Sequence, residues 1–408
     1  MLRPDKTTSN TLPTKDSINW RYAKLFLSIW SLVIFVPAAV VLLIDPFQVF
    51  HKSWLSKVFF YKDNERYQIA GVLKNYLDDD SAYNGVIIGT SISANITAAD
   101  IASTLGWRVV NLSVRAAPLT ERFYILKKSL EHSSVKHVLM EVYANDTEDD
   151  VDFIQDNSAD FPAYLYNDSL RDKQHYVFNL SVFHNCWVLL RLNGWLVWMP
   201  QTIQDFFKPD INAWSEGDVG KWNVWVTDPS HRDAFLLFNQ PANLQKKKQE
   251  LATVRALHKK ELRQWQTDYA FDIQKRCLVD VIKAHPDVQF DLWFSPVNLG
   301  LYASGFNREN INKNVEFRRF LVKSLDGQTN VRLFGFDNVL SITADMRNYM
   351  DYSHFSSAIQ KQVLQDITQG NYRLTADNID VYAEQFKNNI LTFDIAVPAT
   401  TDYLQNTK

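Results

Sequence analysis

Three polar residues, one near the start of the chain and two near its end, have the side-chain types that acyl transfer needs. The reaction uses a hydroxyl nucleophile, a base that takes its proton, a group that orients the base, and hydrogen-bond donors for the oxyanion. Ser91 can supply the nucleophile, His354 the base, and Asp351 the orienting carboxylate. Backbone amides of Ser91 and near Ser113, with the side chain of Asn145, can supply the donors. The sequence therefore predicts a serine-based acyl-transfer site, provided that the fold brings these residues together.

A parallel sheet is the structure that would bring them together. Short apolar runs alternate with helical stretches, which is typical of an α/β fold with parallel strands. Functional groups of such sheets gather beyond the carboxyl ends of the strands. Ser91 follows the first run, Ser113 the second and Asn145 the third, while Asp351 and His354 come after the fifth. The expected strands lie at residues 85–89, 107–112, 135–142, 288–294 and 331–336.

The order of these motifs resembles the SGNH, or GDSL-like, hydrolase superfamily. Gly89-Thr90-Ser91 stands where that family has Gly-Asp-Ser, and Asp351-Tyr352-Ser353-His354 matches its last block. Ala144-Asn145-Asp146 resembles its Gly-x-Asn-Asp block, with Tyr143 in the place of the glycine. The resemblance covers about residues 84–370 apart from an insertion. It implies a three-layer, flavodoxin-like α/β domain.

The same resemblance implies roles for individual residues. Ser91, Asp351 and His354 would be catalytic, and the oxyanion would be held by Ser91, Ser113 and Asn145. The glycine of the family's second block is absent, and Ser113, Arg115 or Ala116 stands near its place. A side chain there would crowd the oxyanion, although a backbone amide can still donate. The resemblance implies no cofactor and no metal.

The N-terminal segment points to the membrane-tethered envelope members of that superfamily. An apolar stretch, Asp45-Pro46-Phe47 directly after it, and Gly-Thr-Ser in place of Gly-Asp-Ser are similar to those members. They include proteins that work beside membrane-bound O-acyltransferases on polysaccharides or teichoic acids. The resemblance therefore implies an esterase or O-acyltransferase, with O-acetyl the expected acyl group. Its partners would be an envelope polysaccharide or glycolipid and a polytopic membrane acyltransferase.

Each candidate residue also has a structural interpretation. Ser91 can be a strand-end turn or a helix cap, Asp351 a helix cap, and Asn145 a turn residue. Thr90 and Ser93 are alternative hydroxyls. Two further Asp-x-x-His pairs, Asp172/His175 and Asp228/His231, fall in the insertion and are expected to be solvated loop residues.

Residues 25–44 form the expected membrane anchor. These twenty residues contain no charge, and a helix of that length spans roughly 30 Å, the thickness of one bilayer core. A cleaved signal peptide is the alternative, but such peptides have a shorter apolar region followed by small residues. Five basic residues precede the stretch and three follow it: Arg3, Lys6, Lys15, Arg21 and Lys24, then Lys52, Lys57 and Lys62. The bias predicts a cytoplasmic N-terminus, a single pass through the inner (cytoplasmic) membrane and an extracytoplasmic domain.

A second apolar stretch, residues 177–199, is interrupted by Arg191, His184 and three asparagines. We expect a buried or interfacial amphipathic helix there and no second span, because an arginine in the bilayer costs several kcal/mol. The insertion is rich in tryptophan, which is typical of a core, of sugar stacking or of contact with lipid headgroups. The residues concerned are Trp187, Trp195, Trp198, Trp214, Trp222 and Trp225.

The expected organisation has five parts. A cytoplasmic tail (1–24), the anchor (25–44) and a connector (45–83) precede the α/β domain (84–370). The insertion, expected to be mainly helical, covers about residues 146–243, a long helix follows over 245–284, and residues 371–408 form an extension.

Composition excludes several classes of protein. A net charge of −3 with mixed signs leaves no basic surplus for nucleic-acid binding. Two cysteines, Cys186 and Cys277, are too few for a disulfide framework or for a zinc site built from cysteine alone. The resemblance leaves two functions from different classes, beside the alternative of a structural envelope protein with no ligand. One is the membrane-anchored enzyme, and the other is a catalytically degenerate, glycan-binding or assembly subunit of an envelope polysaccharide system.

Overall fold

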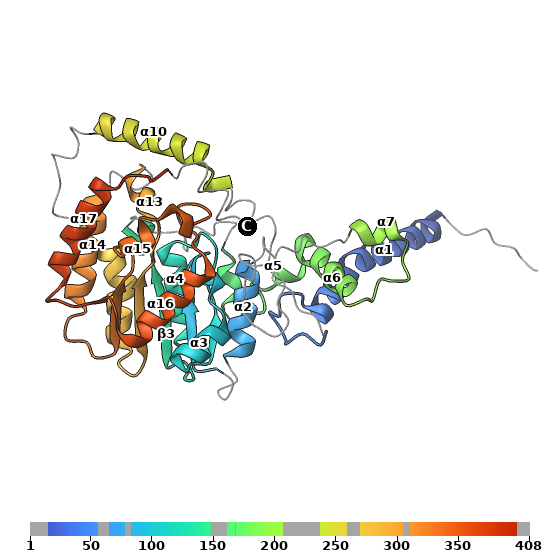
Figure 1. Cartoon of the computed structure of the whole chain (residues 1–408). Helices are drawn as coiled ribbons and strands as arrows, with labels where there is room; N and C mark the ends of the chain where they lie inside the picture. The colour runs from blue at the N-terminus through green and yellow to red at the C-terminus, as the bar shows by residue number, and fades with distance from the viewer. Residues whose placement is uncertain are drawn as a thin grey trace, which may run out of the picture. The chain divides into compact units, whose positions relative to one another are not determined.

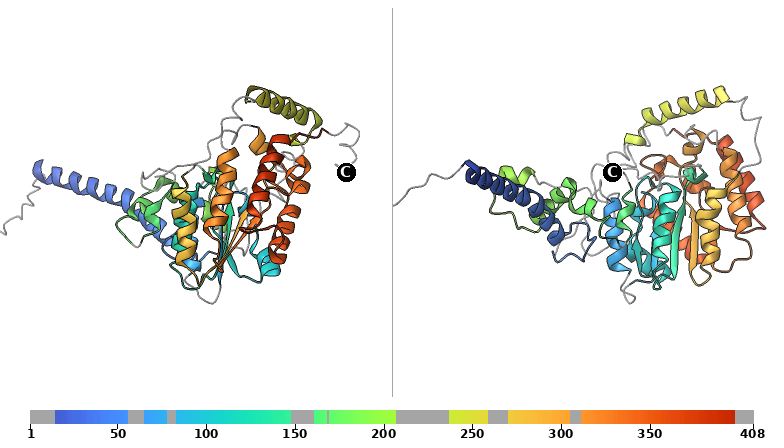
Figure 2. Two further views of the ribbon diagram at one scale, coloured as in Figure 1. Left: turned by 90° about the vertical axis from the view of Figure 1, so that its left-hand side faces the viewer. Right: turned by 180° about the vertical axis from the view of Figure 1, so that it is seen from behind.

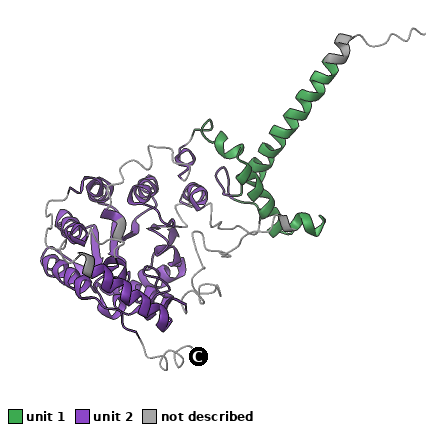
Figure 3. Cartoon of the chain, turned by 90° about the horizontal axis from the view of Figure 1, so that it is seen from above, with its two compact units in different colours: residues 1–46, 53–56, 169–208 green, residues 47–52, 57–168, 209–408 purple. Residues whose placement is uncertain are grey.

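The computed structural model in Figure 1 describes residues 15–55, 65–77, 83–147, 161–167, 169–206, 237–258, 270–304 and 311–397. The chain divides into two compact units (Figure 3). Unit 1 comprises residues 1–46, 53–56 and 169–208, and unit 2 comprises residues 47–52, 57–168 and 209–408. Part of the expected insertion therefore belongs with the N-terminal helix.

Unit 2 is built on a six-stranded sheet of order β2-β1-β3-β4-β5-β6. The first five strands along this order are parallel, and β6 is antiparallel to β5. The expectation of a wholly parallel sheet is therefore wrong at one edge, where Gly370 and Tyr372, both with left-handed backbones, turn the chain back after a helix. The strands are β1 (Gly85–Ile88), β2 (Val109–Asn111), β3 (His137–Val142), β4 (Gln289–Phe294), β5 (Val331–Gly335) and β6 (Arg373–Leu374).

Side chains alternate between the two faces of the sheet, and helices cover both faces (Figure 2). Val86 and Ile88 of β1 join one core, whereas Ile87 joins the other. Both cores consist of buried apolar side chains, and each fully buried Leu, Ile or Phe contributes about 1.5–3 kcal/mol. The first face carries α2 (Glu65–Tyr76), α4 (Leu119–Ser129), α12 (Asp280–Ala284) and α14 (Ile311–Ser324), and the second carries α3 (Ala98–Leu105), α13 (Leu299–Ala303), α16 (Ser357–Gln369) and α17 (Ile379–Thr392).

The C-terminal region completes this domain. The sequence placed a domain boundary at residue 370, but β6 pairs with β5 beyond it. Helix α17 buries Ile379, Phe386 and Ile390 in the two cores. The region from β6 to α17 is therefore an integral part of the α/β domain.

The long helix expected over 245–284 is interrupted. Helix α10 (Pro241–His258) precedes Ala270 and Phe271, which are not helical. Phe271 has φ −118° and ψ 40°, outside the helical range, and its buried ring packs against Phe317 and Phe320. The chain then continues through α11 (Asp272–Gln274), a π-helical turn (Lys275–Val279) and α12.

Short helical elements lie in the segments that connect the longer helices and the strands. They are η1 (Ser93–Asn95), η2 (Ala144–Thr147), η3 (Ala163–Leu165), α15 (Leu340–Thr343) and η7 (Met346–Asn348).

Unit 1 contains α1 (Lys15–Ile44), α5 (Gln174–Val177), α6 (Leu180–Leu192) and α7 (Gln201–Phe206). Within α1, the segment 20–44 contains an 18-residue window with a mean hydropathy of 2.7, and this is the one described helix long and apolar enough to cross a membrane. A membrane anchor and a signal sequence both have these properties. The second apolar stretch forms α6, whose 13 residues are too few for a span.

Candidate active site

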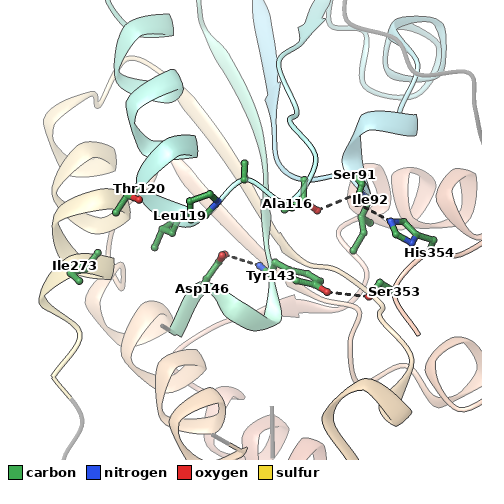
Figure 4. A pocket seen from close by; sticks show the side chains of 13 residues that line it. Ser91, Ile92, Ala116, Leu119, Thr120, Tyr143, Asp146, Ile273, Ser353 and His354 are labelled. Carbon is green, nitrogen blue, oxygen red and sulfur yellow. Dashed lines mark hydrogen bonds between the residues drawn. The ribbon is translucent and has the colours of Figure 1, made fainter. Parts of the chain in front are cut away.

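A pocket of about 320 Å³ opens at the carboxyl ends of β1, β2 and β3 (Figure 4). Five chain segments line it, one of which contributes Ile273 of α11. The turn after β1 contributes Ser91, the segment after β2 contributes Ala116, the segment after β3 contributes Tyr143, and a loop near residue 350 contributes His354. The segments that the sequence analysis placed at strand ends therefore meet around one cavity.

Ser91, His354 and Asp351 form a continuous hydrogen-bonded relay. Ser91 Oγ lies 2.8 Å from His354 Nε2, and the two side chains point toward each other in Figure 4. His354 Nδ1 lies 2.6 Å from Asp351 Oδ2. Because a carboxylate only accepts hydrogen bonds, Nδ1 carries the proton and Nε2 is left to accept from the serine hydroxyl. The structure brings together the three residues that were predicted from motifs 260 positions apart.

Hydrogen bonds within the Asp351–His354 loop organise it, and the amide of Asn298 also donates to the carbonyl of Tyr352 at 2.9 Å. Asp351 Oδ1 accepts hydrogen bonds from the amides of Ser353 and His354, both at 2.7 Å. Burial opposes ionisation of Asp351, but the hydrogen bond and charge of His354 and these two amides prevail, so the pKa of Asp351 is lowered. The side chains of His354 and Asp351 remain 19% and 44% exposed. The imidazole of His354 is thus held by a carboxylate and remains accessible from the pocket.

The turn that carries Ser91 is held by a buried carboxylate, Glu141 of β3. Its Oε2 accepts from the backbone amide of Thr90 at 2.9 Å and from the Thr90 hydroxyl at 3.0 Å. The hydroxyl of Ser93 donates to the same oxygen. Glu141 is fully buried, so the three donors stabilise a charge that solvent does not reach. Thr90 and Ser93, the alternative hydroxyls, therefore support the turn that presents Ser91.

Gly89 and Asn111 complete the support of this turn. A Cβ at Gly89 would lie 2.7 Å from Glu141 Oε2, closer than real Cβ contacts, so only glycine fits beside the carboxylate. Asn111, the last residue of β2, donates through Nδ2 to the carbonyls of Ser93 and Ile96, each at 3.0 Å. The position of Ser91 is thus fixed from two neighbouring strands.

Sequence reasoning missed the role of Glu141. The available signal was a lone carboxylate inside the apolar run His137–Val142, because a charge is rarely fully buried without a partner. Asn111 was quoted only as the end of the second run. Its signal was weaker, since asparagine at the end of a strand is common in ordinary turns.

The segment after β2 places Ala116, not Ser113, at the pocket. The amide of Ser113 donates to Asn111 Oδ1 at 3.0 Å, and Ser113 does not line the cavity. Ala116 lines it and has φ = 52°, a left-handed conformation that favours glycine and costs an alanine about 1–3 kcal/mol. The strained residue lies where the resemblance expects the second-block glycine.

Charged side chains fix both neighbours of Ala116. The amide of Arg115 donates to Glu65 Oε2 at 2.8 Å, and the Arg115 guanidinium pairs with the same carboxylate. Arg122 Nε donates to the carbonyl of Ala117 at 3.2 Å. Arg122 is buried and also donates to the carbonyl of Glu141 at 2.7 Å. One arginine therefore ties the segment after β2 to the end of β3.

The third segment contributes Tyr143 and Asp146. The Tyr143 hydroxyl lies 3.0 Å from Ser353 Oγ, and burial raises the pKa of the phenol to about 12, so it stays neutral. Asp146 accepts from the Tyr143 amide at 2.7 Å and pairs with buried Arg122. Asn145 belongs to η2, but its side chain lies outside the described part of the chain, so its role stays a prediction.

The remaining candidates lie elsewhere. Asp172 and His175 belong to unit 1, and Asp228 and His231 lie outside the described residues. Within the described ranges, no group of three or more His, Cys, Asp or Glu side chains is placed to hold a metal ion. Cys186 and Cys277 are free and buried, and burial raises the pKa of their thiols to about 12 and about 11.

Comparisons of the chain with protein-family models, curated proteins and solved structures give no match. Evidence for a function therefore comes from the geometry of the pocket and from the residues that line it.

Proposed function

We propose that the protein is a membrane-anchored, extracytoplasmic serine esterase or O-acyltransferase of the SGNH type. The observation that carries this proposal is the relay from Ser91 Oγ through His354 to Asp351, with separations of 2.8 Å and 2.6 Å. The parallel strands have the order 2-1-3-4-5, the order of flavodoxin-like sheets, which supports the expected fold family. The substrate proposed from the resemblance is an O-acetyl group on an envelope polysaccharide or glycolipid.

In the proposed reaction, Ser91 Oγ attacks the ester carbonyl while His354 Nε2 takes its proton. The bond to the leaving oxygen then breaks, and the imidazolium returns the proton to that oxygen. Asp351 keeps the proton on Nδ1 and stabilises the imidazolium as it forms. A water molecule or a sugar hydroxyl attacks the acyl-serine in the second half, with His354 again as base. Attack by water makes the protein an esterase, and attack by a sugar hydroxyl makes it a transferase; in both cases Ser91 regains its proton.

The oxyanion is assigned to backbone amides beside Ser91. The Ser91 amide stays a candidate, as does the Asn145 side chain. For the donor on the segment after β2, the pocket favours Ala116 over Ser113, because the Ser113 amide already bonds to Asn111. A strained backbone at a pocket wall is a frequent feature of sites that orient a donor.

The test is turnover of 4-nitrophenyl acetate by the full-length chain in detergent. Wild type should hydrolyse the ester, and Ser91→Ala should lose activity by about 10³-fold or more. Ser103→Ala, an exposed serine on α3, is the matched control and should keep the wild-type rate. Equal rates for wild type and Ser91→Ala would contradict the proposal.

The second candidate is a degenerate glycan-binding or assembly subunit. Ala116 in place of the second-block glycine is the observation that favours it. A fluorophosphonate that labels activated serines separates the two candidates. Labelling of wild type and its loss in Ser91→Ala support the enzyme. Absence of labelling, with binding of envelope glycan that survives Ser91→Ala, supports the binding subunit.

A further inference from the structure

Unit 1 exposes an unusual concentration of large apolar side chains in residues 178–198. Leu180 at the start of α6 is 81% exposed. Val197 and Trp198, in the turn after α6, are each 74% exposed, and Phe178 and Trp195 are also exposed. A contiguous apolar surface on a folded unit usually marks contact with a protein or a membrane. We call residues 178–198 the apolar hairpin.

The apolar hairpin packs against one end of α1, the candidate membrane span. Helix α6 lies beside α1 in Figure 1 and contacts it. The residues of α1 that are buried, Ala38, Val41 and Ile44, lie in its last two turns, whereas residues 24–36 are exposed. Cys186 and Leu189 are buried on α6. The hairpin is thus fixed at the level where α1 ends.

Two hydrogen bonds fix this level. The hydroxyl of Tyr176, just before the hairpin, donates to Asp45 Oδ1 at 2.8 Å, and Asp45 ends α1 with a left-handed backbone. Trp54 Nε1 donates to the carbonyl of Leu43 at 2.8 Å, and the Trp54 ring packs edge-on against Trp195. These contacts place the ring of Trp195, which packs on Trp54, near the last turn of α1.

The length of α1 gives the depth of this surface in a bilayer. The uncharged stretch of α1, residues 25–44, is about 30 Å long at about 1.5 Å per residue, which matches a hydrocarbon core of about 30 Å. Both ends of this stretch therefore lie at the boundary with the headgroup layers. Trp20, exposed shortly before the stretch, and Trp195, near its end, then mark two interfaces, where tryptophan is favoured.

We propose that the apolar hairpin is a membrane-contact element. Its exposed side chains lie in the boundary between headgroups and acyl chains, in the leaflet that the end of α1 reaches. The occupant of this surface is lipid, because the hairpin is fixed to the end of the spanning helix and continues its apolar surface. This inference is independent of the reaction proposed for Ser91.

Site-directed spin labelling of the full-length chain in phospholipid nanodiscs tests the proposal. Labels at Leu180→Cys and Val197→Cys report on the hairpin. Leu32→Cys, in the middle of α1 and 61% exposed, gives the lipid reference, and Val381→Cys, 61% exposed on α17 of unit 2, gives the water reference. The native cysteines are buried, with thiol pKa values raised to about 12 and about 11, so they label slowly.

Power saturation with oxygen and with a water-soluble nickel complex then measures depth. We expect collisions at positions 180 and 197 to shift from nickel toward oxygen, so that they resemble Leu32→Cys more than Val381→Cys. If both hairpin labels collide with nickel as readily as Val381→Cys, the proposal is wrong. That result would mean that lipid does not cover this surface and would point to a protein partner, which the nanodisc samples do not supply. Ester hydrolysis, measured on the same samples, reports separately on the proposed enzyme.

Discussion

The two halves of the relay are held in place in different ways. The turn that carries Ser91 donates three hydrogen bonds to Glu141, a fully buried carboxylate on a neighbouring strand. The loop that carries His354 depends on Asp351, three residues earlier, on amides of the same loop, and on the Asn298 amide, which donates to the carbonyl of Tyr352 at 2.9 Å. Its side chains are partly exposed.

This difference indicates that the turn of Ser91 is coupled to the stability of the fold and that the loop of His354 is less so. A buried charge is tolerated only while its donors are in place, so Glu141 links the position of Ser91 to the stability of the whole sheet. A side chain in a loop near solvent can be removed without leaving a buried charge unpaired. We therefore expect substitutions in the loop to reduce the rate alone. Substitutions under the nucleophile turn should reduce stability as well.

His354→Ala should have the largest effect. Loss of the base should reduce ester hydrolysis by about 10⁴-fold, which is about 5.5 kcal/mol in the barrier. Because the imidazole is partly exposed, the free energy of unfolding should change by less than about 1 kcal/mol. Initial rates and urea unfolding measure the two quantities. His132→Ala, beyond the C-terminal end of α4, is the control and should match wild type in rate. A large loss of stability in His354→Ala would remove the contrast between the two regions.

Glu141→Gln should have the second-largest effect, and it should lower both the rate of ester hydrolysis and the free energy of unfolding. The amide cannot accept all three donors as strongly, so we expect about 2–4 kcal/mol less stability and a rate per folded molecule about 10–100-fold lower. Asp337→Asn is the matched control, since Asp337 is also fully buried and pairs with Arg318 away from the pocket. It should lose stability and keep its rate. Equal rates per folded molecule in the two variants would show that Glu141 is merely structural.

The relay could be predicted from the sequence because its members sit at strand ends. Ser91, Asp351 and His354 follow apolar runs whose order in the sheet is set by parallel pairing, so their types and order were sufficient. Glu141 was hidden within a strand, where composition favours a packing role. The contacts that make it a support involve Thr90 and Ser93, some 50 residues away, and no local pattern reports them.

The fold was predictable in its parallel portion and less so at its margins. The runs from 85–89 to 331–336 became strands, but β6 has only two residues and little apolar pattern. The strained backbone at Ala116 was not predictable, because alanine rarely adopts a left-handed conformation. The association of α6 with α1 joins segments more than 130 residues apart, and hydrophobicity alone does not identify the partner.

Tyr143→Phe should have the smallest effect, and it tests a side-chain hydrogen bond between the segment after β3 and the His354 loop. The phenol is neutral at ordinary pH, since burial raises its pKa to about 12, and its hydroxyl lies 3.0 Å from Ser353 Oγ. Loss of this hydrogen bond should cost about 1 kcal/mol, or about fivefold in kcat/KM, because hydrogen bonds within the loop and from the Asn298 amide still hold it. Tyr372→Phe, at an exposed tyrosine beside β6, is the control. A loss comparable to that of His354→Ala would mean that the loop depends on the sheet as strongly as the nucleophile turn does, because the amides around Asp351 would then be insufficient to hold His354.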